Sequence, residues 1–278
     1  MSGRATEPSE RPAADDRDAL AAGPASCAAS AEHRRRLQRE RTFFESLLRD
    51  TGELSAAERS PLAARRREMR SARLRASAAL ADRPGQRVLD VGCGTGGYME
   101  PFARGVAATV IAIDLSPALL RHARARSVPN AHISAADACA LPFRDHTFDA
   151  VVGNAVLHHL PLEAAVPELV RVLRPGGRLC FAEPNLVNPH MLLVLNVPWL
   201  RRRAGATDDE TAFVRWRLRR TLERHGLRDV SVRPFDFLYP FTPRALIPVV
   251  AAMAGALEAL PVVREIAGSL LVFGRKAG

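Results

Sequence analysis

The pattern of hydrophobic and polar positions is regular from Arg87 to the C-terminus, where short β-branched runs alternate with helical stretches. The strand-like runs are RVLDVG, TVIAIDLS, AHISAADA, FDAVVGN, GGRLCFAEP, LRDVSVRPF and LLVFGRK. The helical stretches between them are GGYMEPFARG, SPALLRHARARS, PLEAAVPELVRVLRPGG and FVRWRLRRTLERHG. This alternation predicts an α/β fold, a doubly wound and mostly parallel seven-stranded sheet with helices on both faces.

The chain before this region follows a different pattern. Residues 1–30 are rich in Ala, Ser, Pro, Gly and Asp without a hydrophobic period, so we predict a disordered tail. Residues 31–83 are helical in pattern and dense in arginine, which predicts an N-terminal helical cap. Ser60 followed by Pro61 is typical of a helix N-cap with proline at the first helical position. The cap either covers one edge of the domain with a basic face or forms a lid over a site.

Residues 84–278 are expected to form one Rossmann-like domain. Two apolar inserts interrupt its strand–helix alternation, at about residues 185–212 and 238–266. Their uncharged runs are too short to span a bilayer, and the N-terminus lacks the apolar core of a secretory signal. We therefore expect a cytoplasmic protein.

Composition narrows the candidate chemistry. The net charge is +10, but 39 of the 40 basic residues are arginine, a bias that favours GC-rich coding over a nucleic-acid surface. The four cysteines are scattered without a CxxC pair and suggest neither a zinc site nor a disulfide framework. No cluster of His, Asp and Glu has ligand spacing, so no metal is implied.

The first strand-like run leads into a glycine-rich turn. Gly92, Gly94 and Gly97 satisfy G-x-G-x-x-G, in which bare backbone lets a ligand approach closely. Asp114, at the end of the next strand, is placed to bind two ribose hydroxyls. These features fit a dinucleotide as well as other nucleosides. Asp90 extends the pattern to D-x-G-x-G-x-G, with Gly96 in the last position.

At this point the chain resembles the class I S-adenosylmethionine-dependent methyltransferases. VLDVGCGTGG is similar to their first motif, and VIAIDLSPALLRHAR to the segment with their ribose-binding acid. AADACALPFRDHTFDAVVGNAVLHHL resembles their adenine-side segment and fourth strand, and LVRVLRPGGRLCFAEPN their turn into the fifth. These motifs cover about residues 87–185 in the family's order. LRDVSVRPF and LLVFGRK suit the family's closing strand pair.

The resemblance implies S-adenosyl-L-methionine as cofactor. The glycines would allow close approach of its methionine portion, Asp90 would bind the ammonium, and Asp114 the ribose diol. Asp137 and the Ala138 N–H would meet the adenine edge. The full set of expected cofactor-binding residues is Asp90, Gly92, Cys93, Gly94, Gly96, Asp114, Leu115, Asp137, Ala138, Asn154 and Ala155. Alternatively, Asp90 only ties down the glycine turn, Asp137 is a solvated loop acid, and the Cys93 side chain is structural.

The candidate catalytic residues follow the fourth and fifth strands. His158, His159 and Glu183 are titratable groups at strand ends that would face the cofactor. A histidine can remove a proton near neutral pH, as a hydroxyl acceptor requires. The alternative is that at least one histidine is structural. A nitrogen acceptor or an already acidic acceptor needs no base.

The inserts are the natural place for an acceptor pocket, and their apolar character predicts a small, apolar or lipid-like acceptor methylated on O, N or C. They could instead rest on an anionic membrane surface, pack on the sheet, or form a homodimer interface. An NAD(P)-dependent oxidoreductase shares the glycine turn and Asp114 but does not explain Asp90, Asp137 or LRPGG. A non-catalytic cofactor-binding regulator is a further alternative. Nucleic-acid methylation is disfavoured because GNAVLHH replaces the Asn-Pro-Pro-Tyr type motif.

Overall fold

A seven-stranded sheet forms the centre of the computed structural model, which describes residues 31–51, 60–80, 85–103, 108–203, 211–239 and 242–278. The strand order is β3-β2-β1-β4-β5-β7-β6. β1 to β5 pair in parallel, and β7 runs antiparallel between β5 and β6. The bounds are β1 Arg87–Val91, β2 Thr109–Asp114, β3 Ala131–Ala135, β4 Phe148–Asn154, β5 Leu173–Pro184, β6 Leu227–Phe235 and β7 Ser269–Lys276. The predicted α/β fold is confirmed.

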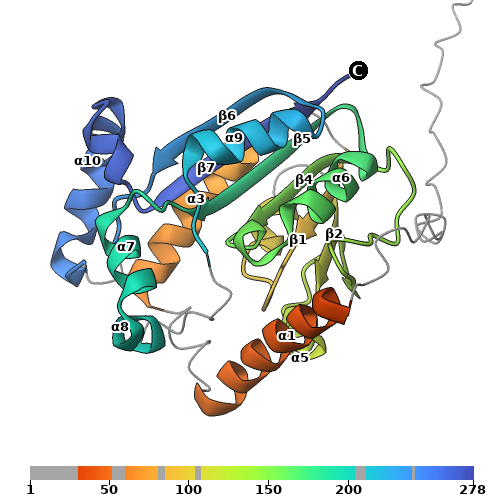
Figure 1. The fold of residues 1–278 in the computed structure, drawn as a ribbon, viewed down its shortest axis with the longest axis horizontal. Helices are drawn as coiled ribbons and strands as arrows, with labels where there is room; N and C mark the ends of the chain where they lie inside the picture. The colour runs from red at the N-terminus through yellow and green to blue at the C-terminus, as the bar shows by residue number, and fades with distance from the viewer. Residues whose placement is uncertain (1–30, 52–59, 81–84, 104–107, 204–210, 240–241) are drawn as a thin grey trace, which may run out of the picture.

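Helices cover both faces of this sheet (Figure 1). The α-helices are α1 Ala31–Thr51, α3 Pro61–Ala78, α4 Met99–Ala103, α5 Pro117–Ala125, α6 Leu162–Val172, α7 Pro189–Asn196, α8 Pro198–Arg203, α9 Arg215–Arg224 and α10 Ile247–Ala259. Short 3-10 turns lie at Leu157–His159, Arg244–Leu246 and Val263–Ile266. The strands are apolar on both sides because each side meets a helix layer.

Alternate residues of the strands pack into different cores. Leu89 of β1 joins the cluster beneath α6 and α9, whose helices contribute Leu169 and Leu222. Val88 faces the opposite way and joins the cluster beneath α3 and α4, with Leu74 and Phe102. The period-two alternation of a strand therefore divides the core into two layers.

The two N-terminal helices have different positions. The Ser60 hydroxyl accepts a hydrogen bond from the Ala63 N–H at 3.1 Å, so the predicted N-cap of α3 is confirmed. α3 packs on the sheet through Leu74 and Ala78. α1 instead lies beside α5 at the end of the sheet where β1 and β2 finish (Figure 1). The predicted tail at residues 1–30 lies outside the described residues.

Candidate functional site

The glycine turn after β1 depends on residues without a side chain. Gly92, Gly94 and Gly96 have φ angles of 66°, 54° and 81°, in the left-handed region that other residues rarely adopt. A Cβ on Gly92 would also overlap Val156, and one on Gly96 would overlap Met99. All three positions therefore require glycine for conformation, and Gly92 and Gly96 require it for space as well.

Asp114 binds this turn to the end of β2. Its Oδ2 accepts from the Gly94 N–H and its Oδ1 from the Ser116 N–H, both at 2.9 Å. Ser116 itself caps α5 by accepting from Leu119 N–H, so Asp114 is not needed as the helix cap. Burial raises the pKa of Asp114, opposed by these backbone N–H groups. Each carboxylate oxygen keeps a lone pair for a ligand.

Asp90 is the most unusual acid of the site. It is only 2% exposed, and its Oδ2 has no hydrogen-bond partner in the described part of the chain. Burial, and next the negative charge of Asp114, raise its pKa to about 8. Below this pKa the buried group is a neutral carboxyl, and its ionised form would require a donor at Oδ2 that the described residues do not supply.

A cleft of about 880 Å³ opens beside the glycine turn, and we call it the donor cleft. Six of the predicted cofactor-binding residues line it: Gly92, Gly94, Asp114, Leu115, Ala138 and Ala155. Asp90, Gly96 and Asp137 are not among the lining residues of this cleft. The Asp137 Oδ1 accepts from the Cys139 N–H at 2.8 Å, which shapes the loop that carries Ala138. The far wall is α1, through Leu37 and Glu40.

A second cleft lies on the other side of the glycine turn. Cys93 and Asn154 line it together with Tyr98 and three arginines of α3, so we call it the arginine cleft. The arginines are Arg66, Arg67 and Arg70. Burial raises the pKa of the Cys93 thiol, which makes it an inert neutral group. Sequence analysis missed the arginines, because among so many arginines nothing marks these three.

Arg70 is the anchor of this region. Its guanidinium donates to Asp236 and Ser269, at 2.8 and 2.6 Å, and to Asn154 Oδ1 at 3.2 Å. Asp236 is fully buried and also accepts from Arg66 at 3.1 Å. Two guanidinium groups thus share one carboxylate, leaving net positive charge at the cleft. Burial lowers the pKa of Arg66, and the neighbouring charge of Arg70 lowers it further.

A third cleft, the acceptor cleft, lies between α3 and the two apolar inserts. It shares Ala155 with the donor cleft and Arg66 and Arg70 with the arginine cleft. The inserts contribute apolar and hydrogen-bonding side chains: Asn188, His190, Met191, Leu238 and Tyr239. The structure thus brings both inserts to the site, beside the carboxyl ends of β4 and β5.

The predicted catalytic residues divide between the clefts. His158 lines the acceptor cleft and is 4% exposed, with its Nδ1 2.7 Å from Glu183 Oε2. Glu183 Oε1 accepts from the Val156 and Leu157 N–H groups, so this carboxylate holds the loop after β4 in place. His159 lines the donor cleft instead.

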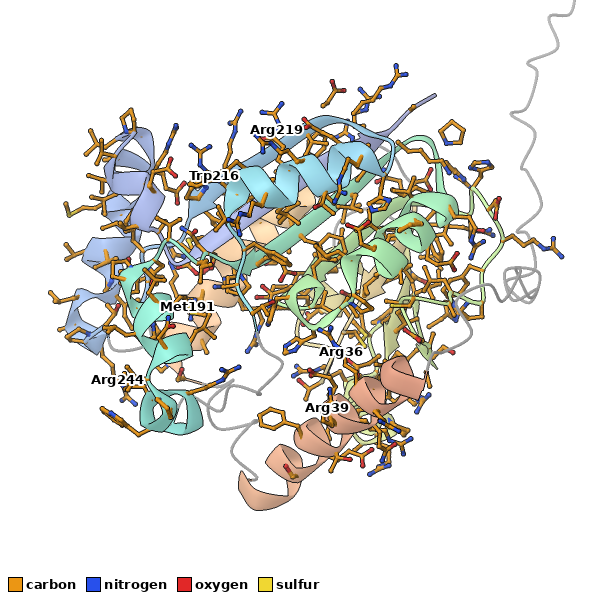
Figure 2. All side chains as sticks on the ribbon, in the orientation of Figure 1. Arg36, Arg39, Met191, Trp216, Arg219 and Arg244 are labelled. Atoms are coloured by element: carbon orange, nitrogen blue, oxygen red, sulfur yellow. The ribbon has the colours of Figure 1, made fainter. Side chains whose placement is uncertain are left out.

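His159 connects this loop to α1. Its carbonyl oxygen accepts from Arg36 Nη2 at 2.7 Å, and its Nδ1 lies 3.2 Å from Glu40 Oε2. Figure 2 shows Arg36 on α1, between that helix and the body of the molecule. The Arg36 hydrogen bond attaches α1 to this loop beside the donor cleft, whereas His159 Nδ1 and Glu40 Oε2 lie close without forming a hydrogen bond.

Other features limit the chemistry. Within the described residues, no group of three His, Cys, Asp or Glu side chains could hold a metal ion. Cys93, Cys139 and Cys180 are buried free thiols. None of the described helices is both long and apolar enough to cross a membrane.

Comparisons with known proteins show that part of this chain is similar to methyltransferases. A family model described as a methyltransferase domain matches residues 89–181. A demethylmenaquinone methyltransferase of Renibacterium salmoninarum is 44% identical over 101 residues, 36% of this chain and 42% of that protein. The chain thus matches less than half the length of this curated relative.

Solved structures are similar over more of the chain. A S-adenosylmethionine-dependent methyltransferase of Thermotoga maritima has a TM-score of 0.59 and 16% identity, covering 84% of this chain and 99% of that one. The cyclase SpnF has a TM-score of 0.51 and 23% identity, covering 76% and 80%. At these identities the likeness shows the fold alone, and the cyclase illustrates that one fold supports different chemistries.

Proposed function

We propose that this chain transfers a methyl group to a small apolar acceptor. Through the match at residues 89–181, it belongs to the class I S-adenosylmethionine-dependent methyltransferases. One observation carries the proposal. The donor cleft and the acceptor cleft meet at Ala155, and His158 lines the acceptor side of that junction. A methyl transfer needs two ligands held end to end with water excluded between them.

The residues of the donor side fit S-adenosylmethionine. The partnerless Oδ2 of Asp90 would accept from the cofactor's ammonium group, a donor that a dinucleotide pyrophosphate does not offer. Asp114 would bind the ribose diol with its remaining lone pairs, and Ala136 and Ala138 would flank the adenine. Arg66 and Arg67 would attract the carboxylate. When bound, the cofactor supplies an electrophilic methyl group on a sulfonium.

His158 is the proposed base for an acceptor hydroxyl. Its Nδ1 lies 2.7 Å from Glu183 Oε2, and the tautomer that donates this hydrogen bond would present Nε2 as the atom that accepts the proton. Glu183 is itself fixed by two backbone N–H groups, so it acts as a positioning residue. His159 belongs to the donor side and to the attachment of α1.

The nature of the acceptor follows from the lining of its cleft. Met191, Leu238 and Tyr239 offer apolar surface, whereas Arg66 and Arg70 place positive charge at one end. This combination suits an apolar ring or chain that carries one ionisable oxygen. The likeness to demethylmenaquinone methyltransferase, a relative whose name denotes a lipid-like quinone substrate, supports the same class.

A methyl-labelling assay tests the function. The protein and methyl-labelled S-adenosylmethionine would be incubated with bacterial extract, which is then separated into organic, aqueous and macromolecular fractions. We expect label in the organic fraction, lost with Asp114→Ala and reduced with His158→Ala. Label in the aqueous or macromolecular fraction would overturn the apolar acceptor. Absence of label, with the cofactor bound in a separate calorimetric titration, would overturn the enzymatic role.

A further inference from the structure

Large exposed apolar side chains gather on one side of the molecule. Of the ten such side chains in the described part of the chain, nine lie on the two inserts, and only Trp216 of α9 lies elsewhere. We call the nine the apolar face: Leu192, Leu193, Trp199, Leu246, Val249, Met253, Leu260, Val262 and Ile266. Five of them lie on α7, α8 and α10, which Figure 1 shows on the same side of the molecule, apart from α9. The other four lie in or next to the 3-10 turns that flank α10. A patch of this kind requires an explanation.

α10 has no polar side chain on its exposed surface. Its exposed residues include Val249 and Met253, about half exposed, and are otherwise Pro, Ala and Gly. Its one charged residue, Glu258, is 12% exposed and pairs with Arg73 of α3 at 2.8 Å. A helix that faces water normally carries polar residues on its outer side. The outer side of α10 is therefore suited to an apolar environment and not to water.

The two inserts form one connected unit beside the acceptor cleft. Asn188, buried at the start of α7, donates to Tyr239 Oη at 3.0 Å and to the Ile266 carbonyl oxygen. Asn185 donates to the Glu265 and Ala267 carbonyl oxygens, at 2.9 and 2.8 Å. Asn188 and Tyr239 also line the acceptor cleft. The same hydrogen bonds thus hold the apolar face together and shape the cleft.

Charged residues flank the apolar face, and the acids among them that the structure describes are paired with arginines. The sequence of the two inserts, residues 185–212 and 238–266, contains five arginines and five acids, of which Asp208, Asp209 and Glu210 lie outside the described residues. The other two acids are neutralised, Glu258 by Arg73 and Glu265 by Arg215 at 2.9 Å. Arg244 is exposed beside Leu246, and Figure 2 shows it on the same side as Met191, away from Trp216 and Arg219. The exposed Arg244 beside apolar side chains matches a surface that has anionic groups above an apolar layer.

We propose that the apolar face docks on an anionic lipid membrane and that the acceptor enters its cleft from that surface. The proposal rests on the proposed function only for the identity of the cleft. A membrane supplies both the apolar interior and the negative head groups that the face requires. A two-fold contact with a second copy would instead place the same surface against itself, and the acids that the structure describes there, Glu258 and Glu265, are already paired with arginines.

The two tryptophans of the chain provide the test, because Trp199 lies on the apolar face and Trp216 does not. Trp216→Phe leaves Trp199 as the only tryptophan, and Trp199→Phe leaves Trp216. Each variant would be titrated, without cofactor, with vesicles of phosphatidylcholine containing phosphatidylglycerol. We expect Trp199 emission to shift to the blue and to be quenched by brominated lipid chains. We expect Trp216 emission to stay unchanged.

A matched pair of charge variants extends the test. Leu193→Glu on the apolar face should weaken partitioning to these vesicles at least about tenfold, whereas Trp216→Glu should leave it unchanged. Unaltered Trp199 emission with vesicles would overturn the proposal. So would Trp199 emission already shifted without vesicles together with a dimer in sedimentation equilibrium, which would assign the face to a second copy. Because no methyl transfer is measured, failure here is distinguishable from failure of the proposed function.

Discussion

At the scale of single residues, Asp90 is an acid whose burial is unfavourable in the free protein and which a bound ligand would stabilise. Its carboxyl group is buried near a second acid with one oxygen unpaired, and its pKa rises to about 8. Because this value lies above the usual one near 4, the folded state binds the proton more tightly than the unfolded state. The contribution of Asp90 to stability therefore declines as pH rises from about 4 to about 8.

Asp90→Asn should separate stability from cofactor binding. The free variant should melt at a higher temperature than the wild type at pH 8, by about 2–4 °C for each kcal/mol of relieved strain. Its affinity for S-adenosylmethionine should be lower. Wild-type affinity should rise from pH 6 to pH 8 as Asp90 ionises, and binding should release a proton. Thermal unfolding and calorimetric titration at several pH values measure both effects. An unchanged pH dependence in the variant would exclude Asp90 as the ammonium partner.

Asp114→Ala should weaken S-adenosylmethionine binding by about 1.5–3 kcal/mol, the scale of charge-assisted hydrogen bonds. Asp229→Ala is the matched control, because Asp229 is a largely exposed acid on β6, away from the donor cleft. Its affinity should equal that of the wild type. Equal affinities for all three proteins in a calorimetric titration would refute the ribose role of Asp114.

The sequence predicts the site residues that belong to one short motif better than those that come together from distant parts of the chain. Asp90, Gly92 and Asp114 belong to short motifs at strand ends, so spacing alone brings them together. Arg70 and Asp236 are 166 positions apart and meet only because α3 packs beside the end of β6. No local pattern distinguishes such a pair. The roles expected for the cofactor-binding and catalytic residues stay predictions until a ligand is bound.

At the scale of elements, the two N-terminal helices have separate tasks. α3 buries Leu74 completely in the sheet core, whereas α1 places Leu37 at the wall of the donor cleft. The Ser-Pro start of α3 could be predicted, because an N-cap is a local feature. The sequence could not predict which of the two helices covers the sheet and which covers the cleft. Both helices are arginine-rich, and only contacts with residues distant in the sequence determine their positions.

A matched pair of leucine variants tests this division. Leu74→Ala should lower the free energy of unfolding by about 2–5 kcal/mol, since it leaves a cavity in a packed core. Leu37→Ala should change stability little but weaken S-adenosylmethionine binding, because it removes apolar surface from the cleft wall. Thermal unfolding and calorimetric titration measure the two effects. Unchanged affinity in Leu37→Ala would show that α1 only covers the edge of the domain.

At the scale of the whole molecule, the parallel sheet and its binding edge follow from the strand–helix alternation. The position of the two apolar inserts in the fold does not follow from this alternation. Within one insert, Met191 turns into the acceptor cleft while Leu193 and Trp199 are exposed. Residues that line a pocket and residues that lie on an apolar surface are equally hydrophobic in the sequence. Only the folded structure shows which residues do which.

The choice between cofactor classes can be tested on the whole fold, because a ligand that joins the ends of β1 and β2 stabilises the entire sheet. S-adenosylmethionine at 100 times its Kd should stabilise the protein by about 2.7 kcal/mol. For a chain of this size we expect Tm to rise by about 5–10 °C. NAD should give no shift, since its pyrophosphate offers no donor to Asp90. At the same concentrations Asp114→Ala should lose most of the shift. A rise in Tm with NAD and none with S-adenosylmethionine would reassign the donor cleft to a dinucleotide, and with it the reaction to hydride transfer.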